Sequence, residues 1–184
     1  MVAFANTDGG RLLLGIRDNG SVAGVRSDEE YYMAEAAAKL YSQPPLSFQT
    51  QQWQIEGKTV LEIVIPRSEE VPHRAQNEEG KWLVYIRKED QNIVAPGIQL
   101  KVWEQQKNPS GVFIRFSDEE KRLLALLESE QQLSLNQFTR LARLPRWKGE
   151  RILVKLIVIG IVGMEITGNG TRFFLRDDFE EPIF

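Results

Sequence analysis

The residues best placed to do chemistry are cationic and lie close together toward the C-terminal end of the chain. Between Thr139 and Lys155, six basic residues stand against one acid, Glu150. They are Arg140, Arg143, Arg146, Lys148, Arg151 and Lys155. Guanidinium and ammonium groups at this density bind phosphate oxygens, so the cluster predicts contact with nucleic acid.

The charge of the whole chain makes this cluster a local feature. The 184 residues include 23 lysines and arginines against 26 acids, a formal net charge of -3 that excludes a generally basic binder. At about 100° per helical residue, Lys148, Arg151 and Lys155 project within about 60° of one another. We therefore predict a basic stripe on a helix that reads duplex DNA. The alternative is that these charges only solvate a protein-interaction module.

Catalytic chemistry is sparse in this sequence. There is no cysteine and only one histidine, His73, which excludes disulfides, thiolate zinc sites and two-histidine metal motifs within one chain. Gly9 to Gly15 is not a phosphate-binding loop, because Ile16 and Arg17 follow where a Lys-Ser/Thr pair is needed. We expect no catalytic residue, no metal and no cofactor, and we expect His73 at the surface.

No membrane segment is predicted. The longest apolar stretch, Ile152 to Met164, is interrupted by Lys155 and two glycines and is too short to span a bilayer. The N-terminus has no basic and hydrophobic targeting segment. Together with the absence of cysteine, these features predict a cytoplasmic protein.

The chain divides at a polar run that contains Pro and Gly. We place a linker at residues 104–111, between a domain of residues 1–103 and a domain of residues 112–184. The overall class is α+β.

The first domain is predicted to contain a small mixed sheet with at least one covering helix. Asn19-Gly20 predicts a type I′ turn, and the Ser27–Glu30 capping box begins a helix that reaches about Ser42. The expected strands are 11–18 and 21–25 around that turn, 48–55 and 58–65 around Glu56-Gly57, and 82–87.

The second domain has the element order of a winged helix-turn-helix. Capping boxes at Ser117–Glu120 and Ser134–Gln137 begin two helices, and Pro145 begins a third that ends near Ile159. A β-hairpin follows over 161–167 and 171–176 and forms the wing. Arg172, next to the glycine-rich tip, is placed to reach phosphate or the minor groove. Trp147 and Phe173-Phe174 are expected to pack in the core or against the wing, and base stacking is the alternative role for them.

The N-terminal residues also resemble a known family. The run from Ala3 through Asn6-Thr-Asp-Gly-Gly10 and on to Val25 is similar to the signature of the Schlafen AlbA-like DNA-binding domain, over roughly residues 1–96. The resemblance implies a bacterial protein in which this domain precedes a winged helix, as in transcriptional regulators. Arg11, Arg17 and Arg87 are the binding candidates on this part of the chain.

The resemblance also raises an enzymatic alternative. RNA-cleaving relatives use three carboxylates, and only one of the three has a counterpart in this chain, Asp18. The chain also opens inside the family motif, so we expect that an N-terminal element is truncated or lost. A lone carboxylate cannot build a paired acid–base or two-metal site, and Asp18 equally suits the turn. We therefore predict a DNA-binding transcriptional regulator. RNA as the partner, an endoribonuclease fragment, and homodimerisation through an exposed sheet edge remain the alternatives.

Overall fold

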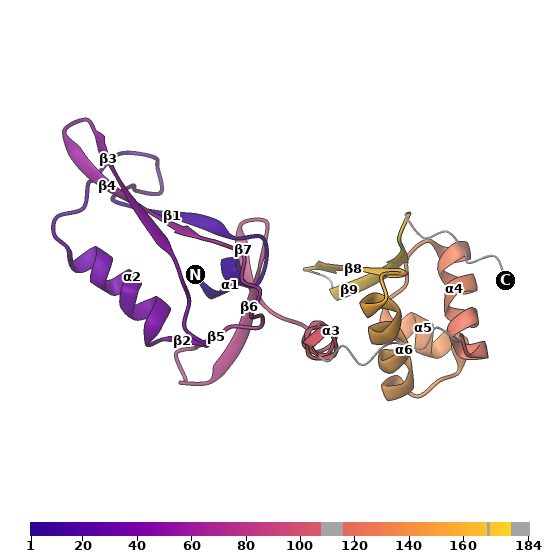
Figure 1. The fold of residues 1–184 in the computed structure, drawn as a ribbon. Coiled ribbons are helices and arrows are strands. Elements are labelled where there is room, and N and C mark those ends of the chain that lie inside the picture. The colour runs from indigo at the N-terminus through magenta and orange to yellow at the C-terminus, as the bar shows by residue number, and fades with distance from the viewer. Residues whose placement is uncertain (108–115, 169, 178–184) are drawn as a thin grey trace. The chain divides into compact units, whose positions relative to one another are not determined.

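The computed structural model describes residues 1–107, 116–168 and 170–177, and it divides the chain into two compact units, Met1–Ala95 and Pro96–Phe184 (Figure 1). Both helices and strands are present, so the α+β class is confirmed. None of the described helices is long and apolar enough to cross a membrane.

The boundary between the units differs from the predicted linker. Residues 104–107 belong to helix α3 (Gly97–Lys107), which packs against α6 (Arg146–Val158) inside the second unit, and residues 108–111 lie outside the described residues. Ile98 and Val102, one helical turn apart, are 7% and 3% exposed and join the core of that unit. The polar residues 104–107 at the end of this helix made the sequence resemble a linker.

The first unit contains a three-stranded antiparallel sheet in the order β1 (Gly10–Leu14), β4 (Lys58–Ile65), β3 (Gln49–Ile55). The predicted β3–β4 hairpin is confirmed. Glu56 and Gly57 both have positive φ, 53° and 72°, as a type I′ turn requires.

The predicted hairpin around Asn19-Gly20 is largely wrong. β1 pairs with β4, and the two predicted strands share an isolated bridge between Ile16 and Val22 with a few backbone hydrogen bonds beside it, such as Ala23 N to Gly15 O at 2.8 Å. Gly20 has φ 81° and donates its N–H to Arg17 O at 2.8 Å, while the Asn19 side chain accepts from Ser21 N at 3.0 Å. Asn19 itself keeps a negative φ, so the loop is a three-residue turn ending in a left-handed glycine.

A second sheet accompanies the first in this unit. This sheet is also antiparallel. The prediction of one mixed sheet is therefore wrong, because the described strands of this unit form two antiparallel sheets. The strand expected at 82–87 is confirmed. Helix α2 (Glu29–Lys39) ends earlier than predicted because residues 42 and 43 pair as a strand. The second sheet has the order β2 (Ser42–Gln43), β5 (Arg74–Gln76), β6 (Trp82–Lys88), β7 (Gln91–Val94).

Asn6, which follows the short helix α1 (Val2–Ala5), connects the start of the chain to the second sheet. Its amide nitrogen donates to the carbonyls of His73 and Tyr85, both at 2.8 Å, and its oxygen accepts from His73 N at 2.7 Å. His73 is 2% exposed, so its expected surface position is wrong. Its ring nitrogens contact Pro44 O at 2.9 Å and Ser68 Oγ at 2.7 Å, which satisfies the imidazole inside the unit.

The second unit carries three further helices and a hairpin in the predicted order. Both capping boxes are present, at Ser117 with Glu120 and at Ser134 with Gln137. Phe173 is 1% exposed, as predicted, whereas Trp147 is 61% exposed and does not pack in the core. The elements are α4 (Asp118–Glu130), α5 (Leu135–Ala142), α6, β8 (Val162–Thr167) and β9 (Gly170–Leu175).

Helices α5 and α6 approach each other closely at Gly149. A Cβ there would lie 2.5 Å from Thr139 Cγ2, so a larger residue would require the Thr139 side chain to turn away or α5 to shift. Phe138, Leu153 and Leu156 fill the core beside this crossing, each with no measurable exposure. The crossing fixes which sides of α6 face its neighbours.

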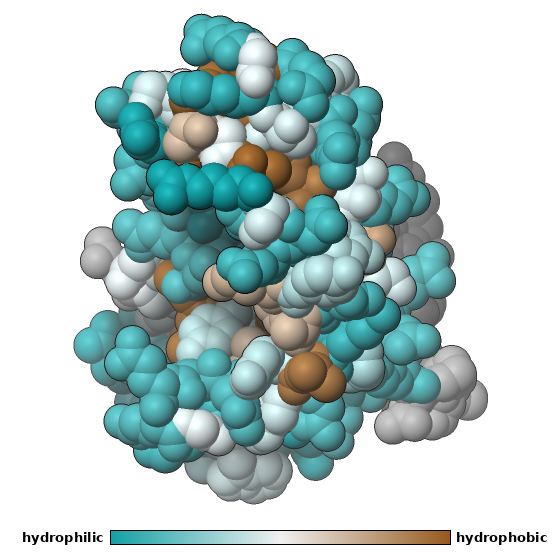
Figure 2. Space-filling model, turned by 90° about the vertical axis from the view of Figure 1, so that its left-hand side faces the viewer, coloured by the Kyte–Doolittle hydropathy of each residue, from teal (hydrophilic) through white to brown (hydrophobic). Residues whose placement is uncertain are grey.

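Figure 2 shows one face of the molecule, on which hydrophobic side chains break through a mostly hydrophilic surface in several places. Large apolar side chains are exposed in the first unit at Tyr32, Met33, Leu40 and Tyr41.

Candidate nucleic-acid interface

The three residues of the predicted basic stripe on α6 do not share one role in the structure. Lys148 Nζ lies 2.6 Å from Glu119 Oε1 and Lys155 Nζ lies 2.8 Å from Glu120 Oε1, so both lysines face α4. The hydrogen bond from Lys148 is the main reason why the pKa of Glu119 is lowered from its ordinary value of 4.5. Arg151 does not join these ion pairs. Two of the three stripe residues therefore connect helices within the unit.

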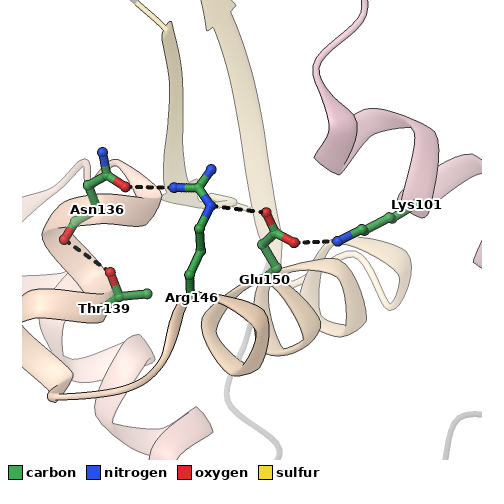
Figure 3. Close-up of polar contacts among 5 residues, drawn as sticks. All are labelled: Lys101, Asn136, Thr139, Arg146 and Glu150. Atoms are coloured by element: carbon green, nitrogen blue, oxygen red, sulfur yellow. Dashed lines mark hydrogen bonds and ion pairs between the residues drawn. The ribbon is translucent and has the colours of Figure 1, made fainter.

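Arg146 lies in a polar network on another side of α6 (Figure 3). Its Nη1 donates to Asn136 Oδ1 at 2.8 Å, and its Nε lies 3.5 Å from Glu150 Oε1. The other Glu150 oxygen pairs with Lys101 of α3. One acid thus holds α3 and Arg146 to the same stretch of α6.

This network borders a groove of about 400 Å³ lined by α3, the start of α5, α6 and β9. Arg172, the predicted wing residue, lines it and donates from Nη1 to Gln137 Oε1 at 2.8 Å. The same Gln137 oxygen accepts from Ser134 N in the capping box. Arg172 is therefore connected to the N-terminal cap of α5. The wing tip at Asn169 lies outside the described residues.

Helix α3 covers part of α6. Val154 lies away from Ile152, Leu153 and Leu156 on the helical wheel, yet it is only 4% exposed. It belongs to the same core cluster as Ile98 of α3, and α3 packs against α6. The open surface of α6 is consequently limited to its first turns.

That open surface carries a tryptophan and arginines. Trp147 is 61% exposed, and the Arg151 guanidinium lies over its ring, with Cζ 5.5 Å from the ring centroid. Arg140 and Arg143, at the end of α5, are exposed as well. We call Arg140, Arg143, Trp147 and Arg151 the Arg–Trp surface. Within the described ranges, none of its three arginines has an acidic partner.

A fourth arginine adds positive charge at the end of α5. Arg122 of α4 is exposed and donates from Nη2 to Leu141 O at 3.3 Å, one of the last carbonyls of that helix. Sequence reasoning missed Arg122, whose place depends on helix packing. The exposure of Trp147 could have been predicted, because on the helical wheel it projects about 170° from the centre of Ile152, Leu153 and Leu156.

The three candidates of the first unit lie on separate elements. Arg11 on β1 pairs with Glu62 at 3.1 Å, and Arg17 is exposed in the turn after β1. Arg87 on β6 lies over the Phe4 ring, with Cζ 5.3 Å from the centroid, and donates to Asn92 Oδ1 at 3.1 Å. Arg11 and Arg87 thus have contacts within the unit, while Arg17 points to solvent.

The predicted carboxylate, Asp18, is exposed in the turn between Arg17 and Gly20. Across residues 1–107, 116–168 and 170–177, no three histidine, aspartate or glutamate side chains gather in a way that could hold a metal ion.

Comparison with solved structures gives one similarity of low identity. The DIP2311 protein from Corynebacterium diphtheriae is 17% identical with a TM-score of 0.43, over 95% of this chain and 28% of that one. The chain thus spans less than a third of that protein's length. No curated protein matches this sequence.

A family model described as Schlafen, AlbA_2 matches residues 1–96, which coincides with the first unit, Met1–Ala95. The match covers more than half of the 184 residues. The chain therefore belongs to the Schlafen AlbA_2 family, and this membership indicates a nucleic-acid-related role.

Proposed function

We propose that the protein binds duplex DNA through its second unit and regulates transcription. The order α4, α5, α6, β8 and β9 supports a winged helix-turn-helix in this unit, because three helices followed by a two-stranded hairpin are the elements of that motif. Family membership of the first unit points to the same class of partner.

The observation that carries the proposal is the Arg–Trp surface. Arg140, Arg143 and Arg151 are exposed and lack acidic partners among the residues described, so their guanidinium groups are available to phosphate oxygens. Lys148 and Lys155, which belong with Arg151 to the stripe that the sequence predicts, already bind carboxylates of α4. Using them on DNA would require breaking those pairs, so we assign them a structural role.

The position of α3 affects the mode of binding. A reading helix contacts base edges only when its outer side enters the major groove. Here α3 packs on α6 beside Val154 and pairs with Glu150 through Lys101, which leaves the first turns of α6 open. We therefore propose that phosphate contacts supply most of the affinity, with strong salt dependence and weak sequence preference.

The position of Asp18 gives no reason to propose catalysis in addition to binding. Asp18 is exposed in the turn after β1, a position in which aspartate is common without any catalytic role. We propose no catalytic step.

The test is a salt titration of duplex binding with the full chain. Arg140→Gln with Arg143→Gln removes two charges from the Arg–Trp surface, and Arg11→Gln with Arg17→Gln removes two from the first unit. Each phosphate contact contributes about 0.9 to the slope of log K against log salt. We expect the first pair to lower the slope by about 2 and the second to leave it unchanged. The proposal is overturned if the wild type does not bind duplex DNA, or if both pairs change the slope equally.

A further inference from the structure

We infer that Trp147 and Arg151 form a stacking site for one unpaired nucleobase, so that the protein prefers DNA with single-stranded nucleotides next to a duplex over blunt duplex. This inference rests on the proposed function, because the same arginines supply the phosphate contacts.

Trp147 is unusual among the tryptophans of this chain. Trp103 is buried at 9% exposure, Trp53 donates its indole N–H to Glu62 Oε2 at 2.8 Å, and Trp82 is 38% exposed. Trp147 is 61% exposed, and it projects from the first turn of α6 away from Ile152, Leu153 and Leu156. An indole with this exposure contributes little to the core, and its apolar ring is available to a partner.

The partner of the indole inside the chain is a cation. Arg151 lies one helical turn after Trp147, and its Cζ is 5.5 Å from the ring centroid. This contact orients the indole and places a positive charge beside it. The remaining exposed ring area accommodates a base, while the guanidinium lies where the phosphate of the same nucleotide is attracted.

The charge around the pair favours nucleic acid. Arg140 and Arg143 extend the positive surface along the end of α5, and Arg122 adds to it through Leu141 O. Between residues 135 and 155 the only acid is Glu150, which is bound to Arg146 and Lys101. An acidic peptide brings carboxylates to the arginines, but it offers a flat ring to the indole only where it also carries an aromatic residue. A nucleotide uses both kinds of group, which is why we choose it as the occupant.

The test compares three DNAs on the full chain by fluorescence anisotropy: a blunt duplex, the same duplex with a short thymidine overhang, and the same duplex with an overhang of abasic nucleotides. The two overhangs carry equal charge and differ only in the bases. Base stacking on an aromatic side chain predicts that the thymidine overhang binds about 5- to 150-fold more tightly than the abasic one.

The variants are Trp147→Leu and, as the matched control, Trp82→Leu in the first unit. Trp147→Leu keeps an apolar side chain at an exposed position, so the fold is expected to persist, which its circular dichroism checks. We expect Trp147→Leu to bind both overhangs equally and Trp82→Leu to keep the preference. Arg151→Lys retains the charge but not the planar group, and we expect it to reduce the preference.

The outcomes separate this inference from the proposed function. If the wild type binds thymidine and abasic overhangs equally but still binds duplex through Arg140 and Arg143, the stacking site is refuted and the proposed function stands. If an acidic peptide displaces DNA from the wild type but not from Trp147→Leu, the surface is a peptide site and the inference is wrong. If none of the three DNAs binds, both proposals fail.

Discussion

Lys155 of α6 lies 2.8 Å from the Oε1 atom of Glu120, whose side chain is only 7% exposed. The other oxygen of the same carboxylate accepts from Ser117 N at 2.8 Å and closes the N-terminal cap of α4. Glu120 therefore caps one helix and connects it to another. An ion pair in this position acts on the packing of α4 against α6.

Replacing Lys155 should reduce stability. Lys155→Met leaves the Glu120 carboxylate buried without this lysine, and loss of one partner of such a pair should cost about 2 kcal/mol of the free energy of unfolding. Urea denaturation followed by circular dichroism measures the change. Arg151→Met, which removes an exposed charge, is the control and should cost less than about 0.5 kcal/mol. Equal costs in the two variants would contradict the structural role of Lys155.

The Lys148–Glu119 pair predicts a pH dependence. The pKa of Glu119 is lowered in the folded protein, first by the hydrogen bond from Lys148. A lowered folded pKa stabilises the protein above the ordinary value of 4.5, and this contribution is lost as the pH falls through the folded pKa. Lys148→Met should return the pKa of Glu119 toward its ordinary value, as measured by nuclear magnetic resonance titration.

The stability of the same variant supplies the check. Wild type and Lys148→Met should differ at neutral pH and converge well below pH 4.5, where Glu119 is protonated in both. A stability difference that is the same at neutral and acidic pH would show that Lys148 acts through packing alone.

Replacing Arg143 by glycine should increase stability and weaken DNA binding. Arg143 ends α5 with φ 53° and ψ 46°, the left-handed conformation that favours glycine. Arg143→Gly should stabilise the protein by about 0.5–1 kcal/mol, because glycine removes the steric cost there. Arg140→Gly, inside the same helix, should instead destabilise by about 1 kcal/mol. Both variants should weaken duplex binding, so anisotropy titrations and thermal unfolding together distinguish the two effects.

Substitution of Asn6 should lower the stability of the first unit more than most single substitutions there. Asn6→Ala removes two buried hydrogen bonds to the backbone of His73 and one partly buried bond to Tyr85 O, which should cost about 3 kcal/mol. Asn19→Ala removes exposed turn contacts and should cost less than about 1 kcal/mol. Chemical denaturation of both variants checks the contrast, and a cost for Asn6→Ala below that for Asn19→Ala would disprove this role.

Several local signals in the sequence predicted the structure correctly, although the local signal at Asn19-Gly20 predicted a hairpin that is largely wrong. The Ser117 and Ser134 capping boxes and the Glu56-Gly57 turn all lie within a few residues of the structure they specify. The contacts between Asn6 and His73 join residues that are 67 positions apart, and no local pattern predicts them. His73 accordingly looked like a surface residue.

The candidate site shows the same difference between local signals and contacts that join distant parts of the chain. Helical geometry correctly placed Lys148 and Lys155 on one side of α6, but it could not show that α4 covers this side with Glu119 and Glu120. Whether Arg140, Arg143 and Arg151 contact nucleic acid stays a prediction. Helix α3 was not predicted because the polar residues at its end, 104–107, were interpreted as part of a linker.

Helix α3 has a consequence for fragments of this protein. Ile98 and Val102 belong to the core of the second unit, although they precede residues 108–115 in the chain. A proteolytic cut between residues 107 and 116 should therefore yield two pieces that stay associated, held by this apolar contact and by the pair of Lys101 with Glu150. A recombinant fragment beginning at Phe116 would leave Val154 uncovered and should aggregate, whereas one beginning at Pro96 retains its full core.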